Sequence, residues 1–197
     1  MKITKATFHI SVANSKNLIC DGINQIAFVG RSNVGKSSLI NMLTNNSKLC
    51  KTSQTPGRTR LVNYFLINNS FYFVDLPGYG YAKASGAEIE GWQSLIEPYL
   101  INNENLKLVC ALVDSRIEPT ENDKIMINFL NYYRIPFVVV ATKCDKFAKS
   151  KVKPQLNKIA NTLKLGVKNI YGVSSQTGYG KEELLNYFEQ MVNKNTL

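Results

Sequence analysis

The feature that most constrains this chain is a short loop bounded by glycines. An apolar run, residues 26–30, leads into Gly-Arg-Ser-Asn-Val-Gly-Lys-Ser at residues 30–37, which is the pattern of a phosphate-binding P-loop. Glycines let the backbone curl so that successive N–H groups face inward, and the helix that follows directs its positive N-terminus at the same point. An ordinary glycine turn is the alternative, but a strand before the loop and a helix after it favour a phosphate site.

The side chains of this loop have separate predicted roles. Lys36 would reach the β- and γ-phosphates of a nucleotide, and the Ser37 hydroxyl would ligate Mg²⁺. The residues predicted to surround the phosphates are Gly30, Arg31, Ser32, Asn33, Val34, Gly35, Lys36, Ser37 and Ser38.

Apolar runs alternate with amphipathic stretches along the whole chain, which is typical of βαβ units around a parallel sheet. We predict strands at 7–11, 26–30, 62–67, 71–75, 108–114, 137–142 and 170–173, and helices at 36–45, 88–101, 121–133, 151–164 and 181–193. Asn68-Asn69 predicts a tight hairpin. The expected fold is a three-layer α/β domain over residues 1–197, with one antiparallel strand in a mostly parallel sheet, helices on both faces, and a short N-terminal strand extension at 1–22.

A second carboxylate follows an apolar strand. Phe71-Tyr72-Phe73-Val74 ends in Asp75, and Leu76, Pro77 and Gly78 come next. An aspartate at the carboxyl end of a strand beside a P-loop can hold a water of the Mg²⁺ shell, and the Gly78 N–H can meet the γ-phosphate. Such an aspartate alone is more often a turn residue or helix cap, but it gains meaning after a P-loop.

Two later strand ends predict a base pocket. The segment Thr142, Lys143, Cys144 and Asp145 follows one strand, and Val173, Ser174 and Ser175 close the next. The Asp145 carboxylate can accept hydrogen bonds from guanine N1–H and the 2-amino group, which adenine lacks. The serines can present backbone N–H to guanine O6, or can simply cap a helix. The set predicts a GTP/GDP site rather than that of a P-loop kinase or ATPase.

Composition restricts the setting. The net charge is +10, and residues 143–168 hold eight lysines and one carboxylate, which indicates either nucleic-acid contact or a solvated lysine-rich surface. The four cysteines are far apart, which favours reduced thiols. His9 and other polar residues interrupt the start of the chain, and the longest apolar runs are far too short to span a membrane. We therefore expect a cytoplasmic protein.

The chain resembles the translation-factor-related P-loop GTPases, and within them the EngB-type ribosome-assembly GTP-binding proteins. The motifs that carry this resemblance are 30–38, Thr-Pro-Gly-Arg-Thr at 55–59, Asn-Tyr-Phe at 63–65, Asp-Leu-Pro-Gly-Tyr-Gly-Tyr-Ala at 75–82, Trp92 and 142–146. It implies a Ras-like GTPase fold and a switch threonine at Thr59 that ligates Mg²⁺, although the sequence alone does not choose Thr59 over Thr55. It also implies that Gly57, Arg58, Thr59, Arg60 and Leu61 line the nucleotide. Arg60 departs from the glutamine expected there.

The resemblance further implies a partner and a process. The expected partner is a large ribosomal subunit precursor, through its RNA and proteins, with a consequent need for the protein in cell division and septation. We expect no membrane partner and a monomer. The loops 46–57 and 77–86 are the candidate switches.

Hydrolysis is predicted to be slow, because Tyr79 stands where a water-aligning glutamine often follows Asp-x-x-Gly. Asn33 matches a position that coordinates K⁺ in GTPases of this kind, or else braces the loop by hydrogen bonds. Lys36, Thr59, Gly78 and Asn33 are the predicted catalytic residues. Tyr79 and Tyr81 either stack on RNA or pack against their own loop.

The second function considered is an RNA-binding assembly scaffold whose guanine-nucleotide site is structural. The intact set of Lys36, Ser37, Asp75 and Asp145 favours the hydrolytic switch.

Overall fold

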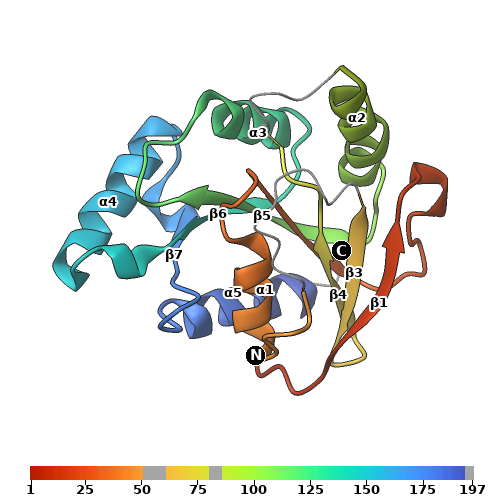
Figure 1. Ribbon diagram of the computed structural model, residues 1–197, viewed down its shortest axis with the longest axis horizontal. Coiled ribbons are helices and arrows are strands. Elements are labelled where there is room, and N and C mark those ends of the chain that lie inside the picture. The colour runs from red at the N-terminus through yellow and green to blue at the C-terminus, as the bar shows by residue number, and fades with distance from the viewer. Residues whose placement is uncertain (51–60, 80–85, 194–197) are drawn as a thin grey trace.

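The central sheet runs in the order β1-β3-β4-β2-β5-β6-β7 (Figure 1). The structure, a computed structural model, describes residues 1–50, 61–79 and 86–193. For residues 86–93 it describes the backbone but not the side chains. The strands of this described part are β1 (Ala6–Val12), β2 (Gln25–Gly30), β3 (Val62–Ile67), β4 (Phe71–Asp75), β5 (Leu106–Asp114), β6 (Phe137–Thr142) and β7 (Ile170–Gly172). Every residue of β2 is buried, as expected for a central parallel strand covered on both faces.

The predicted antiparallel strand is β3, which pairs antiparallel with both β1 and β4. The β3–β4 turn places Asn68 at φ +49° and Asn69 at φ +54°, and the Ser70 N–H donates to the Ile67 carbonyl at 2.9 Å. Two positive φ values in a two-residue loop are the mark of a type I′ hairpin, which asparagine tolerates well. The predicted hairpin is confirmed.

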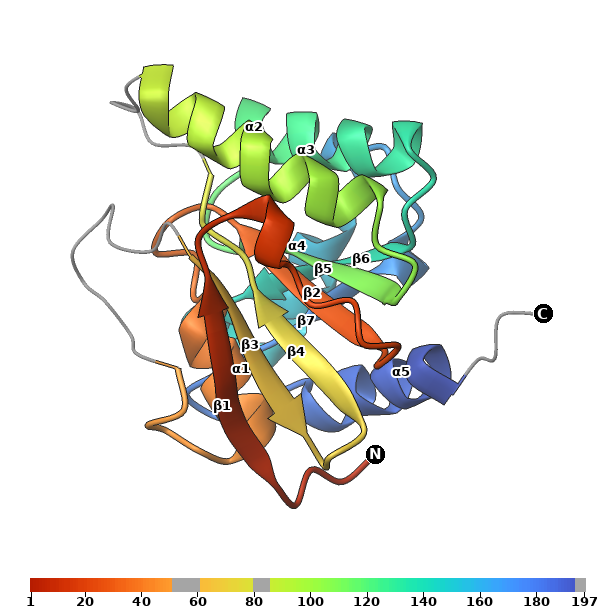
Figure 2. The same ribbon diagram turned by 90° about the vertical axis from the view of Figure 1, so that its right-hand side faces the viewer.

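Helices cover the sheet on both faces (Figure 2). The helices are α1 (Lys36–Thr44), α2 (Gly86–Ile101), α3 (Glu121–Tyr132), α4 (Lys149–Thr162) and α5 (Lys181–Asn193) in the described residues. One buried cluster joins the sheet to α2, α3 and α4 through residues such as Ile96, Ile127 and Ile159. The second joins it to α1 and α5 through residues such as Leu39 and Phe188. This is the predicted three-layer arrangement.

The topology brings the motifs to one edge of the sheet. Strands β2, β4, β5, β6 and β7 are parallel, so their carboxyl ends meet there. In the register of β5 and β6, Asp114 lies opposite Thr142. Among the described helices, none combines the length and the hydropathy that crossing a bilayer requires.

Candidate functional site

The P-loop joins β2 to α1 through two residues with left-handed backbone. Asn33 has φ +62° and Gly35 has φ +109°, and the Val34 N–H donates to the Arg31 carbonyl at 3.2 Å. A glycine takes φ +109° without the Cβ strain that another residue would carry. The helix begins directly after it at Lys36. Backbone amides and the positive helix end therefore converge on one point, as a phosphate group requires.

The lysine of this loop is paired with the carboxylate at the end of β4. Lys36 Nζ lies 2.6 Å from Asp75 Oδ1, and the two side chains are only 12% and 4% exposed. Cys50 lies beside the pair, with its Sγ 3.5 Å from Asp75 Oδ2. Burial, and then the negative charge of Asp75, raise the pKa of Cys50 to about 12, so this thiol stays neutral and donates.

The donor set fits magnesium and a triphosphate. Ser37 is the second residue of α1 and also contacts Cys50, so its hydroxyl and the Asp75 carboxylate both lie next to that thiol. Hard oxygen ligands of this kind suit Mg²⁺, which when bound supplies positive charge against the phosphates. Of the predicted neighbours, Gly57, Arg58, Thr59 and Arg60 lie outside the described residues, and Leu61 is 37% exposed just before β3.

The segment after β4 lies directly against the P-loop. The Tyr79 N–H donates to the Gly30 carbonyl at 3.2 Å. A Cβ at Gly78 would stand 3.0 Å from Ser32 Oγ and 3.2 Å from its backbone nitrogen, so only glycine fits here without displacement. The Leu76 side chain is fully buried in the core and can offer a nucleotide only its backbone. Gly78 therefore lies so close to the P-loop that a displacement of the loop would move Gly78 as well.

The predicted guanine-reading carboxylate is held in place by a buried serine. Ser174 Oγ donates to Asp145 Oδ1 at 2.8 Å, and this bond is the main reason that the pKa of Asp145 lies below its usual range. Lys146 Nζ lies 3.1 Å from the other oxygen. Ser174 Oγ also accepts from the N–H groups of Gln176 and Thr177, so it caps that turn as well. An ionised carboxylate is the acceptor that the guanine edge requires.

The backbone donors of this second segment are fewer than the sequence predicts. The Val173 N–H donates to the Ala141 carbonyl and the Ser174 N–H to that of Tyr179. Among the three, only the N–H of Ser175 makes no hydrogen bond with a described residue, so it alone remains for a base oxygen. The side chains of Val173 and Cys144 are buried in the core rather than turned toward a ligand.

Lys143 ties the base pocket to the P-loop. Its Nζ lies 2.9 Å from the Asn33 carbonyl and 2.8 Å from Asp114 Oδ2, while Thr142 Oγ1 donates to the Val34 carbonyl at 2.7 Å. These contacts fix the distance between the phosphate and base ends of the site. Cross-links of this kind keep both ends in place before a ligand arrives.

Asp114 is a site residue that was not predicted from the sequence. Burial would raise its pKa, but hydrogen bonds from Arg116 and Lys143 outweigh that effect and hold the pKa well below its usual range. Its signal was available, because Asp114 ends the apolar strand β5 in the same way as Asp75 ends β4. A carboxylate at the carboxyl end of a parallel strand next to a P-loop indicates a place in the ligand site.

Asn41 is a second missed residue. It is 8% exposed on the inner side of α1, and its Nδ2 donates to the carbonyls of Ser47 and Cys50 while its Oδ1 accepts from the Cys50 N–H at 2.8 Å. The side chain thus fastens residues 47–50, which form the first part of the candidate switch 46–57. The available signal was a polar residue between the apolar positions of an amphipathic helix.

The contacts of Asn33 and Tyr79 favour one of the two roles that the sequence allows for each residue. Asn33 is exposed, and its side chain makes no hydrogen bond with any described residue, which disfavours a bracing role. The Tyr79 hydroxyl donates to Asp123 Oδ1 at 3.1 Å, and the ring packs against the core. Tyr79 is therefore a packing residue rather than a stacking platform for RNA, while Tyr81 lies outside the described residues.

A loop that holds phosphates and an acidic side chain that recognises guanine, at the same edge of a Ras-like sheet, are the mark of P-loop GTPases. Comparison with known proteins narrows this class. The family model described as 50S ribosome-binding GTPase matches residues 25–143. The probable GTP-binding protein EngB of Clostridium acetobutylicum is 54% identical over 187 residues, covering 94% of each chain. That of Clostridium kluyveri is 50% identical over 193 residues, covering 98% of each.

A crystal structure of a probable EngB protein agrees in fold, with a TM-score of 0.73 at 25% identity over 87% of this chain and 100% of that one. The chain belongs to the EngB family of GTP-binding proteins, and its GTPase domain and Ras-like fold are those predicted from the sequence.

Proposed function

We propose that this GTPase is a nucleotide-dependent switch that assists assembly of the large ribosomal subunit in the cytoplasm. The observation that carries the proposal is the match of residues 25–143 to a family described as 50S ribosome-binding GTPases. A need for the protein in normal cell division and septation follows as a consequence of failed assembly. The partner is a subunit precursor, through its RNA and proteins, and the protein acts on it as a monomer.

The contacts of the site support a switch that reads the phosphates. Gly78 lies so close to Ser32 that a Cβ at Gly78 would displace Ser32, and Asn41 fastens the chain at Cys50. Each candidate switch segment therefore contains one residue that is held beside the phosphate loop. GTP with Mg²⁺ on Ser37 and Thr59 orders these segments, and hydrolysis releases them.

GTP hydrolysis is expected to be slow and to need a stimulant. Tyr79 is bound to Asp123 and offers no carboxamide to align an attacking water. The exposed Asn33 side chain has no partner among the described residues and is free to ligate K⁺, which would supply positive charge next to the phosphates. Ribosomal RNA is the other candidate stimulant.

Co-sedimentation tests the switch against the alternative of an RNA-binding scaffold. Large-subunit precursors are pelleted with the protein in GDP, in a non-hydrolysable GTP analogue and without nucleotide, at several salt concentrations. A switch predicts at least a tenfold tighter association in one nucleotide state than in the other. Equal affinities in all three states would favour the scaffold, and no association at any salt would end the ribosomal proposal.

The proposed stimulation of GTP hydrolysis by K⁺ is tested by a separate measurement. GTP turnover is followed in buffers of equal ionic strength that contain K⁺ or Na⁺, with the Asn33→Ala variant beside the wild type. We expect faster turnover in K⁺ for the wild type and no difference for the variant. Equal wild-type rates in the two buffers would remove K⁺ from the proposal.

A further inference from the structure

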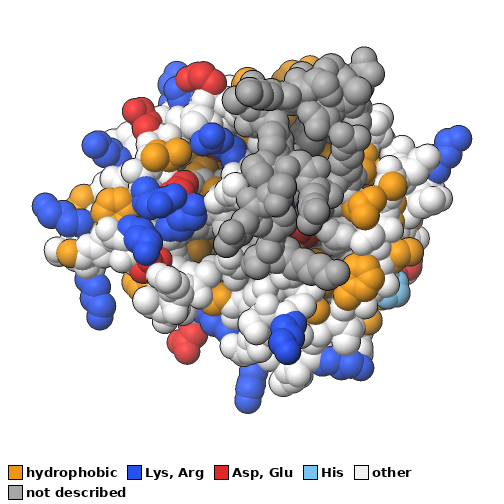
Figure 3. Space-filling model, in the orientation of Figure 1, with side chains coloured by type: hydrophobic (Ala, Val, Ile, Leu, Met, Phe, Trp, Pro, Cys, Tyr) orange, Lys and Arg blue, Asp and Glu red, His pale blue; other side chains and the backbone are white. Residues whose placement is uncertain are grey.

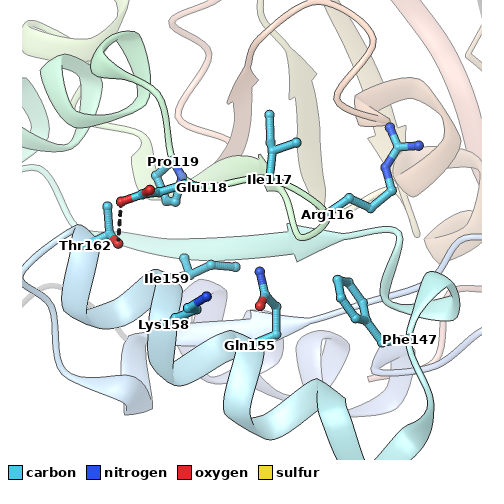
Figure 4. A pocket seen from close by; sticks show the side chains of 9 residues that line it. All are labelled: Arg116, Ile117, Glu118, Pro119, Phe147, Gln155, Lys158, Ile159 and Thr162. Carbon is cyan, nitrogen blue, oxygen red and sulfur yellow. Dashed lines mark hydrogen bonds between the residues drawn. The ribbon is translucent and has the colours of Figure 1, made fainter.

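A groove lies beside the nucleotide site, between the segment that follows β5 and one side of α4 (Figure 4). Its volume is about 250 Å³, and it is lined by residues 116–119, by Phe147 and by the α4 side chains Gln155, Lys158, Ile159 and Thr162. This volume lies just below the range of pockets for drug-sized ligands, so the groove admits one planar ring system rather than a larger molecule.

The surface around the groove carries positive charge that the protein does not neutralise. Helix α4 contains no acidic residue. Six lysines on and after it are exposed and make no ion pair within the described part of the chain: Lys149, Lys151, Lys153, Lys158, Lys164 and Lys168. Lysine and arginine side chains gather on the α4 side of the molecule (Figure 3). A cluster of this kind attracts a polyanion and gains free energy from the release of its counterions.

The groove also offers an aromatic ring and hydrogen-bonding groups, which a surface with charge alone would lack. Phe147 offers an aromatic ring, and Gln155 keeps its side-chain oxygen available because only its Nε2 is engaged, at 2.7 Å from the Ser115 carbonyl. Lys151, Gln155 and Lys158 follow one another at helical spacing, which places them on the same side of α4. Glu118 accepts from the Thr162 hydroxyl at 3.3 Å. These groups can read the edge of a base that stacks on the ring.

We infer that the groove and the α4 lysines bind single-stranded RNA, with one unpaired base in the groove against Phe147 and the phosphates along Lys151 and Lys158. The inference rests on the proposed function and deepens it by naming the surface that contacts the RNA of the precursor. RNA is favoured over an acidic peptide because an aromatic ring beside unpaired cations matches alternating bases and phosphates.

Fluorescence anisotropy with a labelled twelve-nucleotide oligouridine tests the inference, on the full chain saturated with GDP and over a series of KCl concentrations. For Lys151→Gln/Lys158→Gln we expect about tenfold weaker binding and a salt slope smaller by about 1.4, because two phosphate contacts are lost. For Phe147→Leu, which keeps apolar volume, we expect at least about fivefold weaker binding with an unchanged slope.

A matched control changes the same charge elsewhere. Lys2 and Lys5 are exposed and precede β1, which lies at the opposite edge of the sheet from β7 and α4. Lys2→Gln/Lys5→Gln should bind the oligouridine within twofold of the wild type. Unchanged melting temperature and GDP affinity establish that each variant is folded.

Three results would overturn the inference: equal weakening in the control variant, wild-type affinity in Phe147→Leu, or competition by polyglutamate as effective as that by unlabelled RNA. The last result would make the surface a general polyanion or acidic-peptide site. Failure of the proposed function is distinct from these, because the wild type would then bind the oligouridine as expected yet pellet with no subunit precursor.

Discussion

Lys36 Nζ lies 2.6 Å from Asp75 Oδ1, so the phosphate-binding lysine and the strand-end carboxylate share one buried ion pair across 39 residues of sequence. The pair holds both side chains at the nucleotide site. With a nucleotide and magnesium bound, Lys36 would contact the phosphates and Asp75 would hold a water of the Mg²⁺ shell. A buried pair of this kind is costly to break from one side only, because the remaining charge is left without a partner.

Lys36→Met should therefore affect stability as well as binding. We expect the free energy of unfolding to fall by about 3 kcal/mol, because Asp75 stays buried and unpaired. Guanine nucleotide binding should be lost with the ammonium. Urea unfolding and titration with a fluorescent GDP analogue measure the two effects.

The double variant Lys36→Met/Asp75→Asn separates them. With both charges removed, most of the lost stability should return while nucleotide binding stays absent. A single variant as stable as the wild type would show that the ion pair contributes nothing to the fold.

Asp145→Asn should change which base is bound. The amide donates where the carboxylate accepts, so the affinity for GDP should fall about a hundredfold while that for xanthosine diphosphate rises. Competition titrations with GDP, XDP and ADP check this, with ADP as the control that should remain weak throughout. An unchanged order of preference would refute the placement of guanine at Asp145.

Gly78→Ala should disturb the P-loop from outside. The added Cβ would stand 3.0 Å from Ser32 Oγ and 3.3 Å from the Gly30 carbonyl. We expect a loss of about 1–3 kcal/mol in stability or an equivalent loss in nucleotide affinity. Gly166→Ala is the matched control, since nothing lies within 4 Å of its Cβ position and it should behave as the wild type. Equal behaviour of the two variants would show that the close approach has no consequence.

Asp114 makes part of the stability depend on pH. Its folded-state pKa lies below the value of about 3.9 in an unfolded chain, so its contribution is complete above about pH 5 and is lost as the pH falls below about 4. Asp114→Asn should therefore be less stable than the wild type by about 1–2 kcal/mol at pH 7. That difference should shrink at pH 3.5, as measured by denaturant unfolding. A difference independent of pH would assign the loss to packing instead.

Much of the fold and of the site could be predicted from the sequence, because strands, helices and phosphate sites require particular residue types at particular spacings. The bounds of β3, β4, β6 and α5 agree with the prediction, while α2 and α4 each begin two residues earlier than expected, at Gly86 and Lys149. Helix ends vary by one or two residues, so periodicity alone does not determine them. Asp114 and Asn41 were not predicted, because a strand-end aspartate and a polar residue in an amphipathic helix gain a role only from the contacts that the fold gives them, such as that of Asp114 with Lys143.

The residues that this chain needs for phosphates and guanine are determined by its sequence alone, since only certain side chains at certain spacings after a strand can perform those tasks. The tertiary structure decided what holds them. Lys143 contacts the Asn33 carbonyl across 110 residues, and the ring of Tyr79 turns inward to Asp123. Such contacts depend on how the strands are ordered in the sheet, and no local pattern contains that order.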